Sequence, residues 1–288
     1  GLESWTDELI AKDDRTIVFR LKHPFIHLPE LLSKFVSPAV IMPERIAQTD
    51  PFKGFTEVVG SGPFRYVADE YVSGHRAVFA KFDKYQPRPE PVSFASGGLR
   101  VMVDRVEWRV IPDAATAANA LLTGEVDWLE MPMPDLLPML RKSSDVVLGR
   151  LDDWGFISQL RPNHLNPFTD NAAFRRALLA AMDQREVLDA IMGEDTDGTR
   201  TPMGYLATGK PEVDLAGIEA ITKRKSPDDV KRMLKDAGYN GEKLVLLHTS
   251  DQPFYNAASL VVVDTMRKIG VNLDDQVMDW GTVLQRRA

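Results

Sequence analysis

The chain has 288 residues, of which 44% are hydrophobic and 27% charged, with a formal net charge of −7 and no cysteine. This length suggests about two domains or one large one. The acidic balance argues against nucleic acid as a partner, because nucleic-acid-binding domains usually carry a basic surplus. The lack of cysteine excludes disulfides, thiolate zinc sites and cysteine nucleophiles. No apolar run approaches the roughly 18 residues that a membrane-spanning helix requires.

The first five residues, GLESW, have neither the basic start nor the apolar run of a secretory signal peptide, and no Met precedes them. We therefore expect the chain to be a processed or excised piece of a longer protein. On that interpretation its start gives no information about cellular destination.

The first 165 residues carry more strand signals and more Pro and Gly than the remainder. Alternating apolar and polar residues predict strands, and clusters of Pro and Gly predict loops. Strands are expected at 15–25, on both sides of a turn at Ser73-Gly74 within 58–85, and at 99–111; short helices at 27–36 and 42–48; and a loop at 86–98.

A helix–glycine–strand order recurs at 113–130, 226–250 and 255–280. In the first repeat, Gly124 ends the helix and EVDWLE (125–130) is expected to be a strand. In the second, Ser226 is predicted to cap a helix that ends at Gly238. Such alternation predicts an α/β fold in which the last two strands are parallel and joined by a right-handed crossover.

A less regular stretch separates the first repeat from the helices that follow. MPMPDLLPML (131–140) holds three prolines and is expected to be loop and short helix. DVVLGRLDDWGFISQL (145–160) is predicted to be extended chain. We place a domain boundary at 153–166, and Trp154 lies at it. Clefts between domains are where ligand pockets tend to form.

Two helices have unusually complete start and stop signals in NPFTDNAAFRRALLAAMDQREVLDAIMGED (166–195). Thr169 or Asp170 is predicted to cap the first helix. Four residues at helical spacing form its apolar face: Phe174, Ala177, Leu178 and Ala181. Asp183 and Glu186 are expected to form a capping box for the second helix, which ends at Gly193. Three residues of that helix are expected to be buried: Val187, Leu188 and Ile191. A rigid helical pair that begins at a fixed angle after an extended segment suits a hinge.

The sequence patterns of common enzyme classes are missing. Neither H-E-x-x-H, typical of zinc proteases, nor G-x-S-x-G, typical of α/β-hydrolases, occurs. Acidic residues are plentiful, but no spacing identifies a catalytic pair. We therefore expect no enzyme activity, no catalytic residue, no metal ligand and no cofactor. The alternative is an α/β hydrolase-type enzyme that uses a carboxylate pair in an interdomain cleft.

Several motifs, in order along the chain, resemble those of the family 5 extracellular solute-binding proteins, which are the dipeptide-, oligopeptide- and nickel-binding components of ABC importers. The family's helical signature is similar to NPFTDNAAFRRALLAAMDQ, where Asn166 replaces the first proline. Its strand pair resembles VVGSGPFRYVADEYVSGHRAVFAKFDKYQ, where Asp83 replaces an Asn. Its later elements resemble AANALLTGEVDWLE, AGYNGEKLVLL and IGVNLDDQVMDWGTVLQRR.

The resemblance implies a periplasmic-binding-protein-like two-lobe α/β fold (type II, family 5), of which this chain would be a middle fragment, incomplete at both ends. Residues 1–152 would belong to lobe one, with 1–54 a subsidiary segment and 55–152 a mixed sheet with helices. Residues 153–166 would be the crossing or hinge segment, and 167–288 the first part of lobe two.

The implied function is that of the substrate-binding component of an ABC importer. It would capture a peptide or similar small solute by hinge closure and deliver it unchanged to the membrane permease. The resemblance implies a monomer in the periplasm, with no nucleic-acid partner. Relatives with this framework carry peptides, nickel complexes, haem, opines or sugars, and all of these stay open as ligands.

The resemblance also implies where ligand contacts lie. The loop after GEVDWLE would face the cleft, which makes Glu130, Met131 and Met133 candidate ligand-binding residues; methionine adapts to varied ligands. The crossing strand offers four further candidates: Trp154, Phe156, Gln159 and Arg161. Of these, Arg161 is suited to pairing with a ligand carboxylate.

Overall fold

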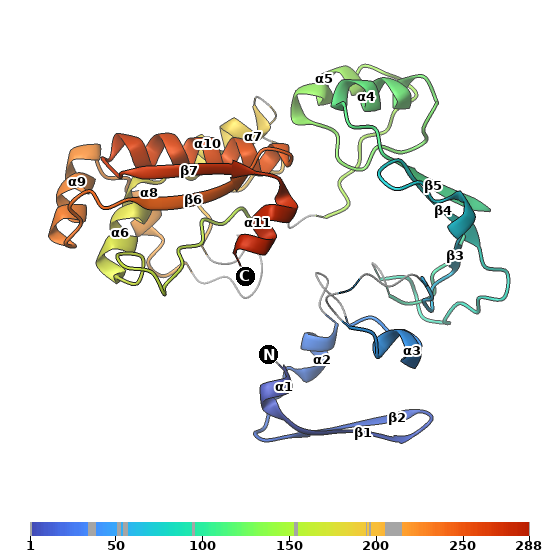
Figure 1. Ribbon diagram of the computed structural model, residues 1–288. Helices are drawn as coiled ribbons and strands as arrows, with labels where there is room; N and C mark the ends of the chain where they lie inside the picture. The colour runs from blue at the N-terminus through green and yellow to red at the C-terminus, as the bar shows by residue number, and fades with distance from the viewer. Residues whose placement is uncertain are drawn as a thin grey trace. The chain divides into compact units, whose positions relative to one another are not determined.

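Figure 1 shows the computed structural model of the chain, which describes residues 2–33, 39–50, 53, 57–93, 96–152, 155–193, 195, 197–204 and 215–287. Contacts within the chain divide it into two units, Gly1–Ile111 and Pro112–Ala288. The sequence predicts a lobe boundary at 153–166 instead, and the assignment of residues to lobes stays a prediction.

The first unit begins with a β-hairpin. Helix α1 (Leu2–Trp5) leads into strand β1 (Thr6–Asp13), which pairs antiparallel with β2 (Thr16–Leu21). Strand β2 was predicted from its alternating residues, and it is confirmed. Strand β1 was not predicted, because charged residues stand near both of its ends and most of its side chains are exposed. Helices α2 (Leu28–Leu32) and α3 (Glu44–Ala47) follow, shorter than the expected ranges.

Strands β3 (Phe64–Tyr66), β4 (Arg76–Lys81) and β5 (Arg105–Arg109) form an antiparallel sheet in that order. The predicted pair around Ser73-Gly74 is confirmed, and Gly74 has φ +74°, which a residue with a side chain rarely adopts. A 3₁₀ helix, η1 (Ala68–Glu70), lies between β3 and β4. Val78 has no exposed surface, whereas Trp108 on β5 is 63% exposed.

The second unit opens with α4 (Ala114–Leu122), capped by Asp113, whose carboxylate accepts a hydrogen bond from Thr116 N. The strand predicted at 125–130 is wrong, since this segment consists of bends and irregular backbone. The N–H groups of Glu125 and Val126 both donate back to Ala120 O, at 2.9 and 3.2 Å. These two N–H groups therefore bond to the C-terminal end of α4 and are not available to pair with another strand. The expected short helices follow as η2 (Pro134–Leu136) and α5 (Leu137–Leu140).

Helix α6 (Ala172–Ala181) buries all four residues of its predicted apolar face. Its cap is Asn171, so the prediction of Thr169 or Asp170 is wrong. The Asn171 Oδ1 accepts from Ala173 N at 2.8 Å, while the Thr169 hydroxyl donates to Asn163 O at 2.6 Å. The Thr169 side chain thus bonds to the preceding turn and does not cap α6.

Helix α7 (Gln184–Met192) begins at Asp183, as predicted, and Asp183 accepts from the N–H groups of Arg185 and Glu186. The Glu186 carboxylate accepts a hydrogen bond from Arg224 at 2.6 Å, which the predicted capping box did not include. The three residues predicted to be buried, Val187, Leu188 and Ile191, are only half-buried. One side of α7 packs on α10, which leaves these side chains at the margin of the core.

The rest of the unit follows the predicted α/β order. After α8 (Glu219–Thr222) come α9 (Pro227–Asp236), β6 (Leu244–Thr249), α10 (Pro253–Lys268), β7 (Leu273–Met278) and α11 (Trp280–Arg286). Strands β6 and β7 are parallel, in register from Leu244 opposite Leu273 to Thr249 opposite Met278, which confirms the prediction. Helix α10 runs along the sheet (Figure 1). Helices α8 and α11 were not predicted.

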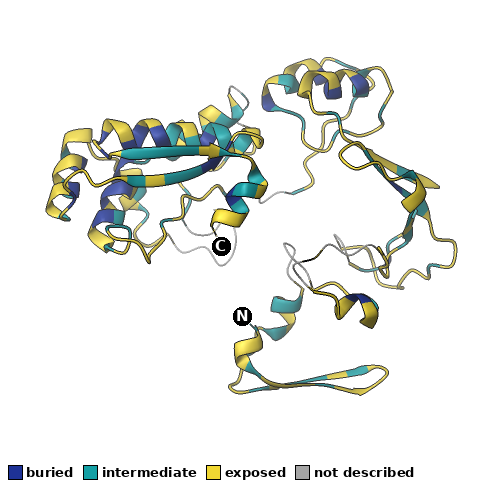
Figure 2. Ribbon diagram, in the orientation of Figure 1, coloured by how far each residue is buried: buried dark blue, intermediate teal, exposed yellow. Residues whose placement is uncertain are grey.

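The core of this unit lies where α6, α9 and α10 meet (Figure 2). Phe174 and Val230 have no exposed surface. Tyr239, after α9, is 6% exposed, and its hydroxyl donates to Glu242 O at 2.7 Å and accepts from Asn272 N at 2.8 Å. One hydroxyl therefore ties the end of α9 to the start of β7. Within the described residues, no helix combines the length and apolar character needed to cross a bilayer.

Replacing Tyr239 by Phe tests this link. The ring stays in the core, but Glu242 O and Asn272 N both lose a partner, so we expect the free energy of unfolding to fall by about 1–3 kcal/mol. Urea denaturation followed by circular dichroism measures the change. Tyr255→Phe is the control, because Tyr255 is 41% exposed. An equal loss in both variants would contradict the role of the Tyr239 hydroxyl.

Candidate functional site

The first predicted group of ligand contacts follows α4. Glu130 is exposed and Met131 is 52% exposed, whereas Met133 is half-buried. Met133 directly precedes η2, and its carbonyl accepts a hydrogen bond from Leu136 N at 3.0 Å. Met133 is therefore fixed by a short helix, and Met131 has a side chain free to meet another surface.

The second predicted group lies in the proposed crossing segment, where Trp154 falls outside the described residues. Phe156 is 81% exposed, and Gln159 and Arg161 are exposed. Residues 155–163 contain no helix or strand, and the Arg161 guanidinium makes no ion pair with a described residue. The structure therefore leaves Phe156, Gln159 and Arg161 accessible, and no hydrogen bond or ion pair between described residues joins them to the segment at 130–133.

A site that the sequence reasoning missed lies at the carboxyl ends of β6 and β7. The side chain of Asp251, just after β6, accepts hydrogen bonds from Trp280 N at 3.1 and 3.2 Å. Its Oδ1 atom also accepts from the hydroxyl of Thr249, a buried residue. One carboxylate thus joins the loop after β6 to the start of α11, which follows β7.

This bridge positions two aromatic rings. Tyr255 and Trp280 are stacked, with ring centroids 5.3 Å apart and an interplanar angle of 16°. The Arg287 guanidinium carbon lies 5.9 Å from the Trp280 ring centroid. Ligands of open α/β sheets bind outside the carboxyl ends of the strands. The signal in the sequence was the polar and aromatic residues that come directly after β6 and β7.

Asp279 is the N-cap residue of helix α11. The Asp279 carboxylate accepts from the hydroxyl of Thr282 at 2.6 Å and from Thr282 N at 2.9 Å. Both bonds favour the charged carboxylate and therefore hold the pKa of Asp279 below its usual value. The bond from the Thr282 hydroxyl has the larger effect, and the bond from Thr282 N has the smaller one. Since Trp280 is the first residue of α11, the same cap helps to hold its ring.

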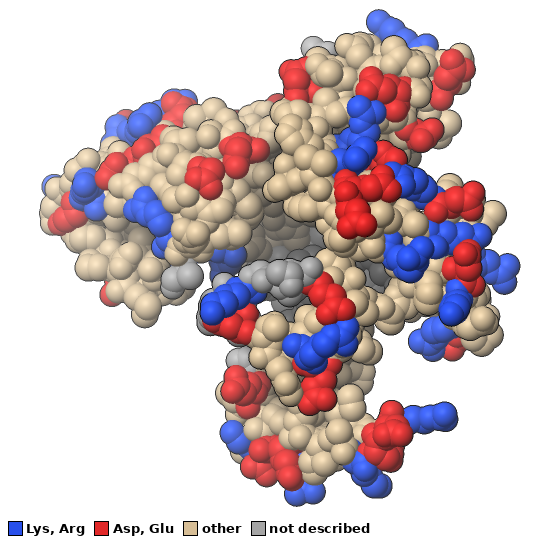
Figure 3. Space-filling view, turned by 45° about the vertical axis from the view of Figure 1, so that its right-hand side comes forward, with Lys and Arg blue, Asp and Glu red and all other residues tan. Residues whose placement is uncertain are grey.

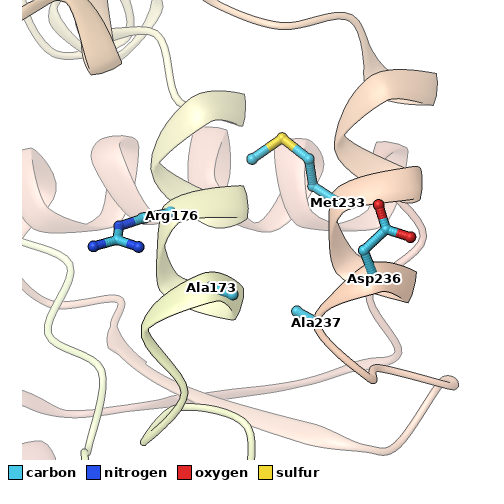
Figure 4. Close-up of a pocket in the computed structure, with 5 residues that line it drawn as sticks. All are labelled: Ala173, Arg176, Met233, Asp236 and Ala237. Atoms are coloured by element: carbon cyan, nitrogen blue, oxygen red, sulfur yellow. The ribbon is translucent and has the colours of Figure 1, made fainter.

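A shallow depression of about 240 Å³ lies between α6 and α9, lined by Ala173, Arg176, Met233, Asp236 and Ala237. Figure 4 shows Ala173 and Ala237 facing one another, with the Arg176 guanidinium directed away from α9. Ligand pockets usually exceed about 300 Å³ and hold convergent polar groups. The depression fits packing between helices better than ligand binding.

Charged side chains cover much of the described surface. Figure 3 shows acidic and basic side chains intermixed over the face in view. Among the residues that the structure describes, no group of three or more His, Asp or Glu side chains is placed to hold a metal ion. Several of the described acids make helix caps or ion pairs, such as Glu70 with Arg105, which lowers the pKa of Glu70.

The helix–strand alternation and the parallel pair β6–β7 place the second unit in the α/β class of proteins. Residues 3–288 match the bacterial extracellular solute-binding proteins, family 5 (middle), and the chain belongs to this family. The chain is 36% identical, over its whole length, to a protein of Sinorhizobium fredii described as a probable peptide ABC transporter periplasmic-binding protein, y4tO. The match covers 54% of that relative. The chain thus spans about half the length of the curated relatives that it matches.

Two solved structures support the fold. The periplasmic binding protein DppA of Helicobacter pylori, in complex with the peptide STSA, has a TM-score of 0.74 at 22% identity, covering 99% of this chain and 52% of that one. The binding protein AgaA of A. tumefaciens R10, in complex with agropinic acid, has a TM-score of 0.72 at 20% identity, covering 98% and 54%. The predicted periplasmic-binding-protein-like fold is therefore confirmed.

The cap of α11 should make stability depend on pH. Because the folded pKa of Asp279 is lowered, its stabilisation is present above the unfolded pKa, near 4, and is lost as pH falls through the folded value. Asn also caps helices but does not titrate. We expect the difference in urea midpoint between the native chain and Asp279→Asn to shrink from pH 6 to about pH 3.

Asp236→Asn is the matched control for the loss of one negative charge, because Asp236 is exposed near the end of α9. A difference for Asp279→Asn that stays constant across this pH range would contradict the assigned hydrogen bonds.

Proposed function

We propose that the chain is part of the substrate-binding component of an ABC importer, and that the whole protein captures a peptide or a similar small solute outside the cytoplasm and delivers it to a membrane permease. Membership of family 5 over residues 3–288 carries this proposal. The 36% identity to a relative described as a peptide-binding component favours peptides among the possible ligands.

The proposed mechanism is closure of two lobes on the ligand. Residues 1–152 would form part of lobe one, 153–166 the crossing segment, and 167–288 part of lobe two. Ligand contacts to both lobes would supply the free energy that populates the closed form. A peptide would be held through its main chain by strand-like hydrogen bonds, and roomy wet pockets would tolerate varied side chains.

The accessible side chains suit such a ligand. Met131 and Phe156 offer apolar surface, and Arg161 offers a cation for a terminal carboxylate. Trp280 and Tyr255 offer a stacked aromatic surface at the sheet edge. Together with Glu130, Met133, Trp154 and Gln159, these residues are the proposed ligand contacts of this chain.

Neither the relatives nor the described acids support a hydrolase with a carboxylate pair. The Sinorhizobium fredii relative and the Helicobacter pylori DppA are described as binding proteins of ABC transporters. We expect the protein to bind its ligand without chemical change, in the periplasm and as a monomer. Sedimentation of the intact protein with and without ligand would check the oligomeric state.

Calorimetric titration of the intact protein tests the function. Mixed tri- and tetrapeptides are expected to bind saturably and to be recovered unchanged. Nickel–histidine complexes and oligosaccharides serve as competing ligand classes. Peptide cleavage would support an enzyme instead, and saturable binding of another class alone would overturn the peptide assignment.

Single substitutions locate the contacts. Trp280→Ala and Arg161→Gln are each expected to weaken peptide binding by about tenfold, or 1.4 kcal/mol, through loss of ring contact or of a charge-assisted bond. Trp108→Ala is the matched control, because Trp108 is also an exposed tryptophan but lies on β5. Equal affinities in all three variants would remove the sheet edge and Arg161 from the site.

A further inference from the structure

Two segments far apart in the sequence meet in the second unit. Helix η2 packs on α7. Arg141, which follows α5, approaches Asp195, which follows α7, with 2.6 Å between Nη2 and Oδ2. The predicted crossing segment, 153–166, lies between these partners in the sequence, so the ion pair spans the proposed hinge.

The Asp195 carboxylate is mostly buried and is fixed by a hydrogen bond from the neighbouring backbone. Its side chain is only 10% exposed, compared with 48% for Arg141. Asp197 N donates to Asp195 Oδ1 at 3.3 Å, and Asp195 N donates to Met192 O at 3.2 Å. A carboxylate that has lost most of its water is strongly destabilised when its cation is removed. The pair therefore has more effect on conformation than a fully exposed one.

A second pair lies beside the first. Arg150 Nη2 is 3.2 Å from Asp197 Oδ2, and both side chains are exposed, at 47% and 79%. Gly198 has φ +79°, and a Cβ atom there would lie 2.5 Å from Arg150 Nη2. The glycine thus lets the guanidinium lie against the backbone. This exposed pair is weakened by salt and mainly adds orientation.

We propose that Arg141, Arg150, Asp195 and Asp197 form an electrostatic latch that holds the segment at 134–150 against α7 and the described residues that follow it, 193, 195, 197 and 198, and so sets the resting conformational equilibrium of the hinge. This inference rests on the proposed two-lobe function. In the proposed two-lobe arrangement the two segments belong to different lobes, so each ion pair favours one relative position of the lobes. The apparent ligand affinity then depends on the fraction of protein that is already in the binding-competent state.

An internal comparison separates a latch from an ordinary surface ion pair. Arg185 and Asp189 pair within α7, at 3.7 Å, with both side chains about half exposed. Both residues belong to one helix, so their interaction is the same in every arrangement of the two segments. A substitution that breaks the Arg185–Asp189 pair therefore removes one ion pair but does not change the relative stability of the hinge conformations.

The experiment measures distances in the full-length protein without ligand. The 288 residues contain no cysteine, so spin labels can be placed at Asn119→Cys on α4 and Lys235→Cys on α9, both exposed sites. Double electron–electron resonance gives the distance distribution. We expect Asp195→Asn and Arg141→Gln each to change the ratio of its populations about fivefold or more. Arg185→Gln is expected to leave it unchanged.

Two features keep the test decisive. Arg141→Gln breaks the pair from its exposed end, so it answers the question even where Asp195→Asn impairs folding. If the latch acts, the double variant changes the distribution no more than the stronger single variant, and 1 M NaCl shifts the native protein toward the same distribution.

Unchanged distributions in Arg141→Gln, together with native-like circular dichroism, would overturn the latch and leave the proposed function standing. A protein that binds none of the ligand classes but shows the shifted distribution would overturn the function and keep the latch as a conformational contact.

Discussion

Burial of one apolar surface between α6, α9 and α10 is the constraint on which the second unit depends. Phe174 has no exposed surface, and Val230 and Met266 belong to the same buried cluster. Burying a side chain of this size contributes about 1.5–3 kcal/mol, more than a helix cap of about 1 kcal/mol. Once these helices are fixed, β6 and β7 pair in parallel and their carboxyl ends come together. The site at Asp251 and Trp280 exists only because of that pairing.

Features that depend on nearby residues could be predicted from the sequence. The caps at Asp183 and Ser226 and the apolar face of α6 follow from signals among neighbouring residues, and the parallel strands follow from the order of helices and strands. The predicted strand at 125–130 is wrong because its first two N–H groups bond to Ala120 O, and residue preference does not reveal such competition. The half-buried face of α7 likewise depends on how far α10 covers it.

The candidate site was less predictable because it is assembled from distant residues. Asp251 and Trp280 are adjacent only through the register of two strands, and no spacing in the sequence indicates their hydrogen bond. The ion pair between Arg141 and Asp195 joins residues on either side of a long segment in the same way. The family resemblance indicated the class of protein, whereas the individual contacts required coordinates.

The side chain of Asn171 has a consequence for which amino acids this position can accept. Its oxygen begins α6, and its Nδ2 donates to Ala237 O at 2.9 Å, just after α9. Aspartate and serine would begin the helix equally well, but neither offers an amide donor to a second carbonyl. Position 171 therefore requires a side chain that both accepts a hydrogen bond from α6 and donates one to Ala237 O. Through this one side chain, a displacement of the N-terminal end of α6 is coupled to the C-terminal end of α9.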